Sequence, residues 1–247
     1  MESLQGKAAF VTGASSGIGR AIALALAANG VQVSLVARRE DRLQEVSAAA
    51  GGDSQTQVLT ADFRDEAQIV AAVDSAADHW GGLDILINSA GVALQASLVD
   101  GDTDVWREML EVNVLGLAVA SREALKHFDA DRGGHVVNIC SMSGHRVPGK
   151  GGFYAPTKFA VRAMTEGLRQ ELRLAGNPTR VSQISPGFVD TELVDKYFES
   201  AGANRYDAVD YQMLSADDTT AAVMHILTAP PHADITDILL RPTAQKT

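Results

Sequence analysis

Short, nearly continuous apolar runs alternate along the chain with longer segments in which apolar residues recur at helical spacing. Such runs are typical of strands buried on both faces of a parallel sheet, and the longer segments are typical of the helices that cover it. We therefore predict an α/β fold with a parallel seven-stranded sheet and helices on both faces. The predicted strands are residues 8–12, 32–37, 57–61, 84–88, 135–140, 180–185 and 235–240. The predicted helices are residues 20–29, 40–50, 64–80, 103–126, 153–175 and 216–227.

One segment, residues 188–215, departs from this alternation. Its aromatic residues are scattered among polar ones, so the pattern favours a lid over a packed helix. No linker, internal repeat or low-complexity tract divides the chain. We predict one domain over residues 1–247, in which residues 188–215 form a lid over the substrate.

Composition narrows the classes of function. The chain has 247 residues, of which 46% are hydrophobic and 21% charged, and this suits one large domain with a full core. The net charge is −10 and Lys and Arg form no long runs. Both facts argue against a nucleic acid or an anionic membrane as the main partner.

The sequence also bears on location. No apolar run approaches the roughly 20 residues of a membrane span. Residues 1–6 lack the basic start and apolar core of a secretory signal. The single cysteine, Cys140, cannot form an internal disulfide, which fits a reducing compartment. We therefore expect a cytoplasmic protein.

A glycine-rich turn, TGASSGIG at residues 12–19, follows the first predicted strand and precedes the first helix. Strand, glycine-rich turn and helix together direct backbone N–H groups and a helix N-terminus at a phosphate, which predicts a doubly wound Rossmann-type dinucleotide site. The glycine spacing is G-x-x-x-G-x-G rather than the common G-x-G-x-x-G. The residues expected at the phosphates are Gly13, Ser15, Ser16, Gly17, Ile18 and Gly19.

Arg38 and Arg39 end the second predicted strand. In a dinucleotide fold this strand end faces the adenosine ribose, where an acidic residue binds the 2′-hydroxyl and an arginine accommodates a 2′-phosphate. The pair therefore favours NADP over NAD. The alternative is a solvated pair of charges at the start of the next helix.

Tyr154 and Lys158 lie four residues apart, which places both on one face of the predicted helix. Free tyrosine has a pKa of roughly 10, so it is a poor acid–base group at neutral pH. A nearby positive charge favours the phenolate and lowers this pKa toward the working range. The pair is a candidate proton donor, although its spacing alone carries little weight.

Together these residues resemble the short-chain dehydrogenase/reductase family, and the likeness covers nearly the whole chain. The glycine-rich turn matches the cofactor motif of that family. Four residues match its catalytic tetrad, with the family's thirteen-residue spacing from Ser to Tyr: Asn113, Ser141, Tyr154 and Lys158. The resemblance implies an enzyme that uses NADP(H), and a homotetramer packed through the two long helices.

The resemblance also implies where the cofactor lies. Asp62 matches the residue that binds adenine, and Pro186, Gly187 and Thr191 match the segment that closes on the nicotinamide. The other cofactor-binding residues that we expect near the same strand ends are Phe63, Asn88, Ala90, Gly91 and Val189.

Two further stretches narrow the resemblance. The run SMSGHRVP at residues 141–148 and the tail RPT at residues 241–243 are similar to a branch of NADP-dependent carbonyl reductases that includes clavulanic acid dehydrogenase and a cytosolic ketosteroid reductase. Two positions depart from the family pattern. Ser89 replaces the second Asn of Asn-Asn-Ala-Gly, which affects one structural hydrogen bond, and Cys140 stands where a Ser is frequent.

By resemblance we expect hydride transfer between NADPH and an aldehyde or ketone. Tyr154 would protonate the carbonyl oxygen, and Ser141 would hydrogen-bond the same atom. Lys158 would lower the Tyr154 pKa and hold the nicotinamide ribose, while Asn113 would hold a water that relays protons. The alternatives are a loop cap for Ser141 and a helix-to-strand hydrogen bond for Asn113.

The expected substrate pocket combines apolar side chains with a few hydroxyls, which suits a medium-sized, partly apolar carbonyl compound or alcohol. We expect no metal. The residues expected at the substrate are Ser141, Ser143, Val147, Tyr154 and Phe188, with His145, Phe153, Leu193 and Tyr197 as further candidates.

Two other functions stay open. One is oxidation of a small 3-hydroxy acid such as serine, which needs a cation near the carboxylate; Arg146 and Lys150 are the candidates. The other is a non-catalytic NADP(H)-binding sensor or scaffold. The complete tetrad argues against the second function, because a scaffold has no need of Tyr154 beside Lys158.

Overall fold

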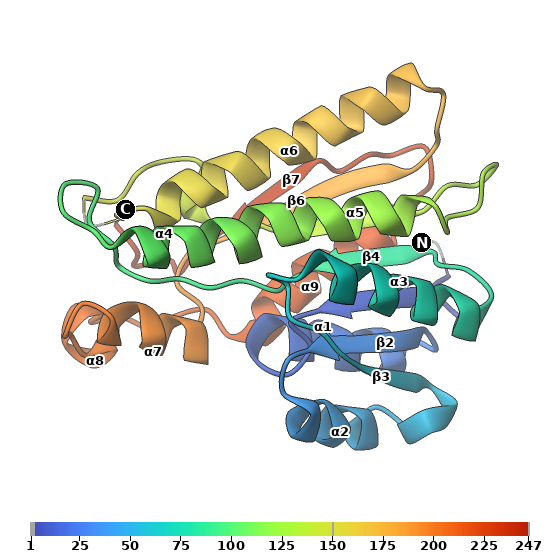
Figure 1. The fold of residues 1–247 in the computed structure, drawn as a ribbon, viewed down its shortest axis with the longest axis horizontal. Helices are drawn as coiled ribbons and strands as arrows, with labels where there is room; N and C mark the ends of the chain where they lie inside the picture. The colour runs from blue at the N-terminus through green and yellow to red at the C-terminus, as the bar shows by residue number, and fades with distance from the viewer. Residues whose placement is uncertain (1–2, 150, 247) are drawn as a thin grey trace.

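The protein is described here by a computed structural model that covers residues 3–149 and 151–246. One parallel seven-stranded sheet runs through it in the order β3-β2-β1-β4-β5-β6-β7 (Figure 1). The strands are β1 Ala8–Thr12, β2 Gln32–Ala37, β3 Thr56–Thr60, β4 Ile85–Asn88, β5 His135–Ile139, β6 Arg180–Pro186 and β7 Asp237–Leu240. The predicted parallel sheet is confirmed, with strand ends that differ by one or two residues.

Helices cover both faces of this sheet (Figure 1). The α-helices are α1 Gly17–Ala28, α2 Glu40–Ala49, α3 Glu66–Trp80, α4 Thr103–Leu110, α5 Leu117–Leu125, α6 Tyr154–Leu174, α7 Glu192–Glu199, α8 Arg205–Ala208 and α9 Ala216–Leu227. Short 3₁₀ turns occur at η1 Gly52–Ser54 and η3 Met142–Gly144, and a π-helical segment, η2 Glu111–Gly116, joins α4 to α5.

The alternation of side chains along each strand divides the core into two layers. In β1, Ala9 and Val11 pack with α1, α2 and α9, whereas Ala8 and Phe10 pack with α3, α5 and the end of α6. Because both sides of the strand are buried, every residue from Ala8 to Val11 is apolar. This explains why the strands read as continuous apolar runs.

The long helix predicted over residues 103–126 is interrupted by the π-helical segment. Asn113 lies in this segment and is buried, with its side chain bonded to both backbone groups of Val92. Gly116, at the end of the segment, approaches the Phe63 carbonyl so closely that a Cβ would lie 2.5 Å from its oxygen. The interruption therefore fits the helix to the loop after β4, consistent with the frequent occurrence of π-bulges at functional sites.

The predicted lid, residues 188–215, contains more regular structure than its sequence indicated. Helix α7 buries Val194 and Phe198, which pack with Val209 in a small cluster separate from the main core. The two ends of the segment 188–215 are joined, because the Asp190 N–H donates to the Leu214 carbonyl at 2.8 Å. The apolar residues at i and i+4 were too few to predict a helix, but the local cluster stabilises one.

No described helix combines the length and the apolar character that crossing a membrane requires.

A buried histidine at the start of β5 makes stability depend on pH. Burial lowers the pKa of His135 from 6.5 to about 3, and its Nε2 bonds to Ser182 Oγ at 2.8 Å. The unfolded chain therefore takes up a proton at this residue below about pH 6.5 while the folded chain does not, so stability falls as the pH falls toward 3. We expect the free energy of unfolding to lose about 2 kcal/mol at pH 5 from this residue.

The measurement is urea unfolding of wild type and His135→Gln at pH 7 and pH 5. The variant should lose less stability between the two pH values than wild type, although it starts lower. The exposed His232→Gln serves as the control. Equal pH dependence in wild type and His135→Gln would contradict the prediction.

Candidate active site

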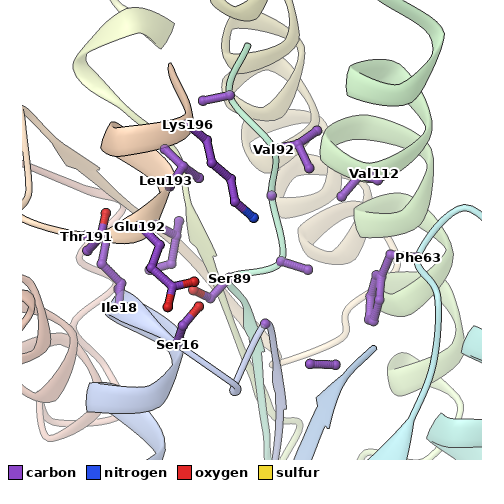
Figure 2. Close-up of a pocket in the computed structure, with 18 of the residues that line it drawn as sticks. Ser16, Ile18, Phe63, Ser89, Val92, Val112, Thr191, Glu192, Leu193 and Lys196 are labelled. Atoms are coloured by element: carbon purple, nitrogen blue, oxygen red, sulfur yellow. The ribbon is translucent and has the colours of Figure 1, made fainter. Parts of the chain in front are cut away.

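A cleft of about 390 Å³ lies at the carboxyl ends of β1, β2, β4, β5 and β6, beside helix α7 (Figure 2). This volume is within the range of roughly 300–1,000 Å³ of small-molecule sites. Most of the residues predicted at the cofactor line this cleft: Gly13, Ser15, Ser16, Gly17, Ile18, Gly19, Arg38, Arg39, Asp62, Phe63, Ala90, Gly91, Tyr154, Lys158, Pro186, Gly187, Val189 and Thr191.

The glycine-rich turn leaves backbone, not side chains, against the cleft. Gly13 has φ +68°, and a Cβ there would lie 2.9 Å from the backbone of Ala90. At Gly19 a Cβ would lie 2.5 Å from the Gly13 carbonyl oxygen. Since only glycine fits such contacts, the spacing of the motif follows from close packing of β1, α1 and the loop after β4.

The same turn exposes a helix N-terminus. Helix α1 begins at Gly17, and its N-cap residue, Ser16, makes no side-chain cap bond to the described residues. The first N–H groups of α1 therefore point at the cleft, together with the positive end of the helix dipole. This cradle fits a phosphate group, as the sequence predicted.

The end of the cleft beside β2 is rich in arginine. Arg38 is exposed and lines the cleft, whereas Arg39 donates to Ser15 Oγ at 3.2 Å and to Ser16 Oγ at 2.9 Å. Asp62 bonds to Arg64, and this bond lowers the pKa of the Asp62 carboxyl. The region can accept an anion beside the Asp62 carboxylate.

The predicted catalytic hydroxyls meet at the other end of the cleft. Tyr154 begins α6, and the side chain of Ser141, which follows β5, lies close enough to the Tyr154 phenol to lower its pKa. The Ser141 Oγ also accepts from the Ser143 N–H at 3.0 Å, so the loop cap considered for Ser141 exists beside the contact with Tyr154. Two hydroxyls are thus arranged to meet one substrate oxygen.

We expected Lys158 to lower the pKa of Tyr154, but in the structure this pKa is raised. Burial raises the pKa of the Tyr154 phenol above its ordinary value, opposed by the Ser141 side chain. Lys158 is itself buried, which lowers its pKa, and its Nζ donates to the Ile139 carbonyl at 2.9 Å. That ammonium lies 5.8 Å from the Tyr154 ring centroid. Desolvation is therefore the largest cause of the pKa shift at each of the two groups.

Asn113 holds the walls of the site together. Its Oδ1 accepts from the Val92 N–H at 2.8 Å, and its Nδ2 donates to the Val92 carbonyl at 2.8 Å and to Thr157 Oγ1 at 3.1 Å. Thr157 in turn donates to the Tyr154 carbonyl at 2.7 Å. The side chain is therefore bonded inside the protein, to the loop after β4 and to α6, whereas the alternative considered for it was a bond from helix to strand.

Asn88, predicted at the cofactor, has its side chain inside the protein instead. Its Nδ2 donates to Asn138 Oδ1 at 2.9 Å and to Ser121 Oγ at 3.0 Å, which links β4 to β5 and α5. Asn88 is buried and is not among the described residues that line the cleft. Its neighbour Ser89 lines the cleft, and the Thr12 Oγ1 accepts the Ser89 N–H at 2.9 Å.

Among the predicted substrate residues, Ser141 and Tyr154 line the cleft. Three other predicted substrate residues are not among the described residues that line the cleft: Ser143, Val147 and Phe188. Ser143 lies in the η3 turn and Val147 is exposed. The Phe188 ring stacks on Phe198, in the small cluster around α7. Of the further candidates, Leu193 lines it, and the Tyr197 ring lies 6.3 Å from that of Tyr154. Phe153 stacks on Trp106, and His145 pairs with Asp237.

Sequence reasoning missed two charged residues of helix α7. Glu192 and Lys196 lie four residues apart on α7, and both line the cleft (Figure 2). The only signal was their place just after the predicted nicotinamide segment. Lys196 extends its ammonium into the cleft (Figure 2). The cations expected near a substrate carboxylate were Arg146 and Lys150. Arg146 is not among the described residues that line the cleft, and Lys150 lies outside the described residues.

The chain is similar to a known protein family and to individual proteins that match its whole length. The description "short chain dehydrogenase" belongs to a family model that matches residues 7–202. Dehydrogenase/reductase SDR family member 11 of Bos taurus is 41% identical over 258 residues, covering 100% of both chains.

Solved structures give the same result. The closed form of serine dehydrogenase complexed with NADP+ superimposes with a TM-score of 0.90 and 30% identity, covering 97% of this chain and 96% of that one. An alcohol dehydrogenase from the archaeon Thermococcus sibiricus, complexed with 5-hydroxy-NADP, superimposes with a TM-score of 0.84 and 27% identity, covering 98% of each chain. With its glycine-rich turn and its Ser141–Tyr154 pair, the chain belongs to the short chain dehydrogenase family.

Proposed function

We propose that this oxidoreductase transfers a hydride between NADP(H) and an aldehyde or ketone, or the corresponding secondary alcohol. The observation that carries the proposal is the contact between the Tyr154 and Ser141 hydroxyls in a cleft that also contains the phosphate cradle. A bound nicotinamide would supply the hydride. The protein then has to orient the carbonyl and move one proton.

Tyr154 donates its proton to the substrate oxygen as negative charge develops there, and Ser141 hydrogen-bonds the same oxygen. The phenol holds its proton at neutral pH, and burial raises its pKa, so the Lys158 ammonium and the Ser141 hydroxyl would have to offset that rise for Tyr154 to release the proton. Lys158 would hold the nicotinamide ribose and attract the phenolate that forms after the transfer. Asn113 fixes the first turn of α6 through Thr157 and so positions Tyr154.

The cofactor preference rests on the arginines after β2. Arg38 and Arg39 line the adenosine end of the cleft, where a 2′-phosphate would meet them. The serine dehydrogenase and the archaeal alcohol dehydrogenase that superimpose on this chain are complexed with NADP+ and 5-hydroxy-NADP, respectively, which supports NADP(H) here.

A second candidate is the oxidation of a small 3-hydroxy acid. Lys196 is the specific observation in its favour, because it brings an ammonium into the cleft where a carboxylate could pair with it. The similarity to a serine dehydrogenase supports the same candidate. In this case Tyr154 and Ser141 keep their roles, with the proton moving in the opposite direction.

We also propose a cytoplasmic homo-oligomer, a tetramer by family resemblance. Among the described residues, four large apolar side chains are exposed on α4, η2 and α6, the long helices expected at the interface: Leu110, Leu115, Phe159 and Leu174. Exposed apolar groups of this kind are common where a second copy packs.

Replacing Tyr154 by Phe tests the proton transfer. We expect kcat to fall roughly 10²- to 10⁴-fold, because the general acid is lost, while the Kd for NADPH stays within twofold. Steady-state absorbance of NADPH and fluorescence titration measure the two quantities. Tyr206→Phe, an exposed tyrosine of α8, is the control and should keep full activity. Turnover near wild type in Tyr154→Phe would refute the role.

Replacing Arg38 by Gln tests the cofactor preference. We expect the Kd for NADPH to rise roughly 10- to 100-fold, because a charge-assisted bond to phosphate is lost, with little change for NADH. Calorimetric titration with both cofactors gives the answer. An equal loss for both cofactors would contradict a phosphate role for Arg38.

A substrate panel separates the two candidates. Neutral ketones and aldehydes should be reduced with NADPH if the first is right, whereas serine and other 3-hydroxy acids should be oxidised with NADP+ if the second is right. In the second case Lys196→Gln should raise KM for the acid about tenfold, because the ion pair is lost, and leave neutral substrates unaffected. Cofactor binding without turnover of any compound would instead indicate the sensor function.

A further inference from the structure

The lid and the start of α2 are joined by one carboxylate. Glu192, the first residue of α7, binds two guanidinium groups: Arg39 Nη1 donates to its Oε2 at 3.0 Å, and Arg42 Nη1 donates to its Oε1. Both bonds lower the pKa of the Glu192 carboxyl, so it is ionised at neutral pH. Each carboxylate oxygen thus has its own arginine.

The same Arg39 guanidinium reaches the phosphate cradle. Its Nη2 donates to the hydroxyls of Ser15 and Ser16, and the Glu192 side chain is turned toward Ser16 in the cleft (Figure 2). The lid lies against the cradle at the next residue too, because a Cβ on Gly17 would lie 3.2 Å from Thr191 Cγ2. Glu192 therefore sits where the arginines meet the glycine-rich turn.

An anion with more negative charge than the Glu192 carboxylate can displace it from these arginines. Arg38, Arg39 and Arg42 carry three positive charges, and Glu192 supplies one negative charge. A phosphate monoester carries about −1.5 to −2 charges at pH 7 and offers three acceptor oxygens. The side chains of Arg39, Arg42 and Glu192 are 37%, 39% and 44% exposed, so their ion pairs are the weak, solvated kind.

We propose that Arg42 belongs to the site for the cofactor's 2′-phosphate, and that Glu192 occupies this site until the phosphate displaces it. The inference rests on the proposed use of NADP(H). A cofactor without the 2′-phosphate leaves the bonds of Glu192 in place. Glu192 is therefore a determinant of cofactor affinity, and its release couples the 2′-phosphate to the position of α7.

The first test is Glu192→Gln, which keeps the shape of the side chain and removes the competing charge. NADPH and adenosine 2′,5′-bisphosphate should bind roughly three- to tenfold more tightly, whereas NADH and AMP should change less than twofold. Glu199→Gln removes the same charge from the far end of α7 and should alter none of these affinities. Unchanged or weaker binding of NADPH, or an equal gain for NADH, would overturn the proposal.

The second test isolates Arg42. Because Arg42→Gln alone also frees Glu192 from one partner, the substitution is made in the Glu192→Gln background. NADPH binding should then weaken roughly tenfold with NADH unchanged, since one phosphate contact is lost. Arg132→Gln breaks an exposed ion pair with Asp129 elsewhere and is the matched control. Equal affinities with and without Arg42 would remove it from the site.

The third test measures the hydrogen exchange of helix α7. Adenosine 2′,5′-bisphosphate should speed hydrogen exchange of the α7 amides relative to AMP, and the difference should vanish in Glu192→Gln. Identical exchange with both nucleotides in wild type would overturn the displacement of Glu192. None of these measurements needs turnover, so they stay informative if no carbonyl substrate is found. If neither NADPH nor NADH binds to wild type, the proposed function itself fails.

Discussion

The site depends on the close approach of three backbone segments. Strand β1, helix α1 and the loop after β4 come together at Gly13 and Gly19, where a side chain would overlap a neighbouring backbone. The Thr12 Oγ1 fixes the same point by accepting the N–H groups of Ser89 and Ala90 at 2.9 and 2.8 Å. With no side chain in the way, the amide groups and the N-terminus of α1 are free to face a phosphate.

Buried hydrogen bonds fix the position of α6 relative to the glycine-rich turn. Asn113, in the π-helical turn, connects Val92 to Thr157, and Thr157 bonds to the carbonyl of Tyr154. A separate chain runs from Asn88 through Asn138 to Thr165 on α6. Because an unpaired buried amide is costly, these bonds specify one position for α6, and so one position for the phenol.

Electrostatics differ sharply between the two ends of the cleft. At the chemical end, burial dominates: it raises the pKa of Tyr154 and lowers that of Lys158. At the arginine-rich end, Arg39 and Arg42 are partly exposed and already have an anionic partner in Glu192. In the proposed enzyme the proton donor is therefore buried away from water. The arginines proposed to bind the cofactor are partly exposed, so that the cofactor can replace water and Glu192 as their partner.

Local patterns were enough for the parallel sheet and the glycine-rich turn, because continuous apolar runs and glycine spacing are properties of neighbouring positions. The approach of Ser141 to Tyr154 was expected only from the family resemblance. The π-helical turn at Asn113, the inward side chain of Asn88, the helix in the lid and the Glu192 bonds to Arg39 and Arg42 were not predictable in this way. Each depends on which distant segment lies opposite. Only tertiary packing brings residue 192 to residues 39 and 42, since their separation along the chain leaves no local trace of the contact.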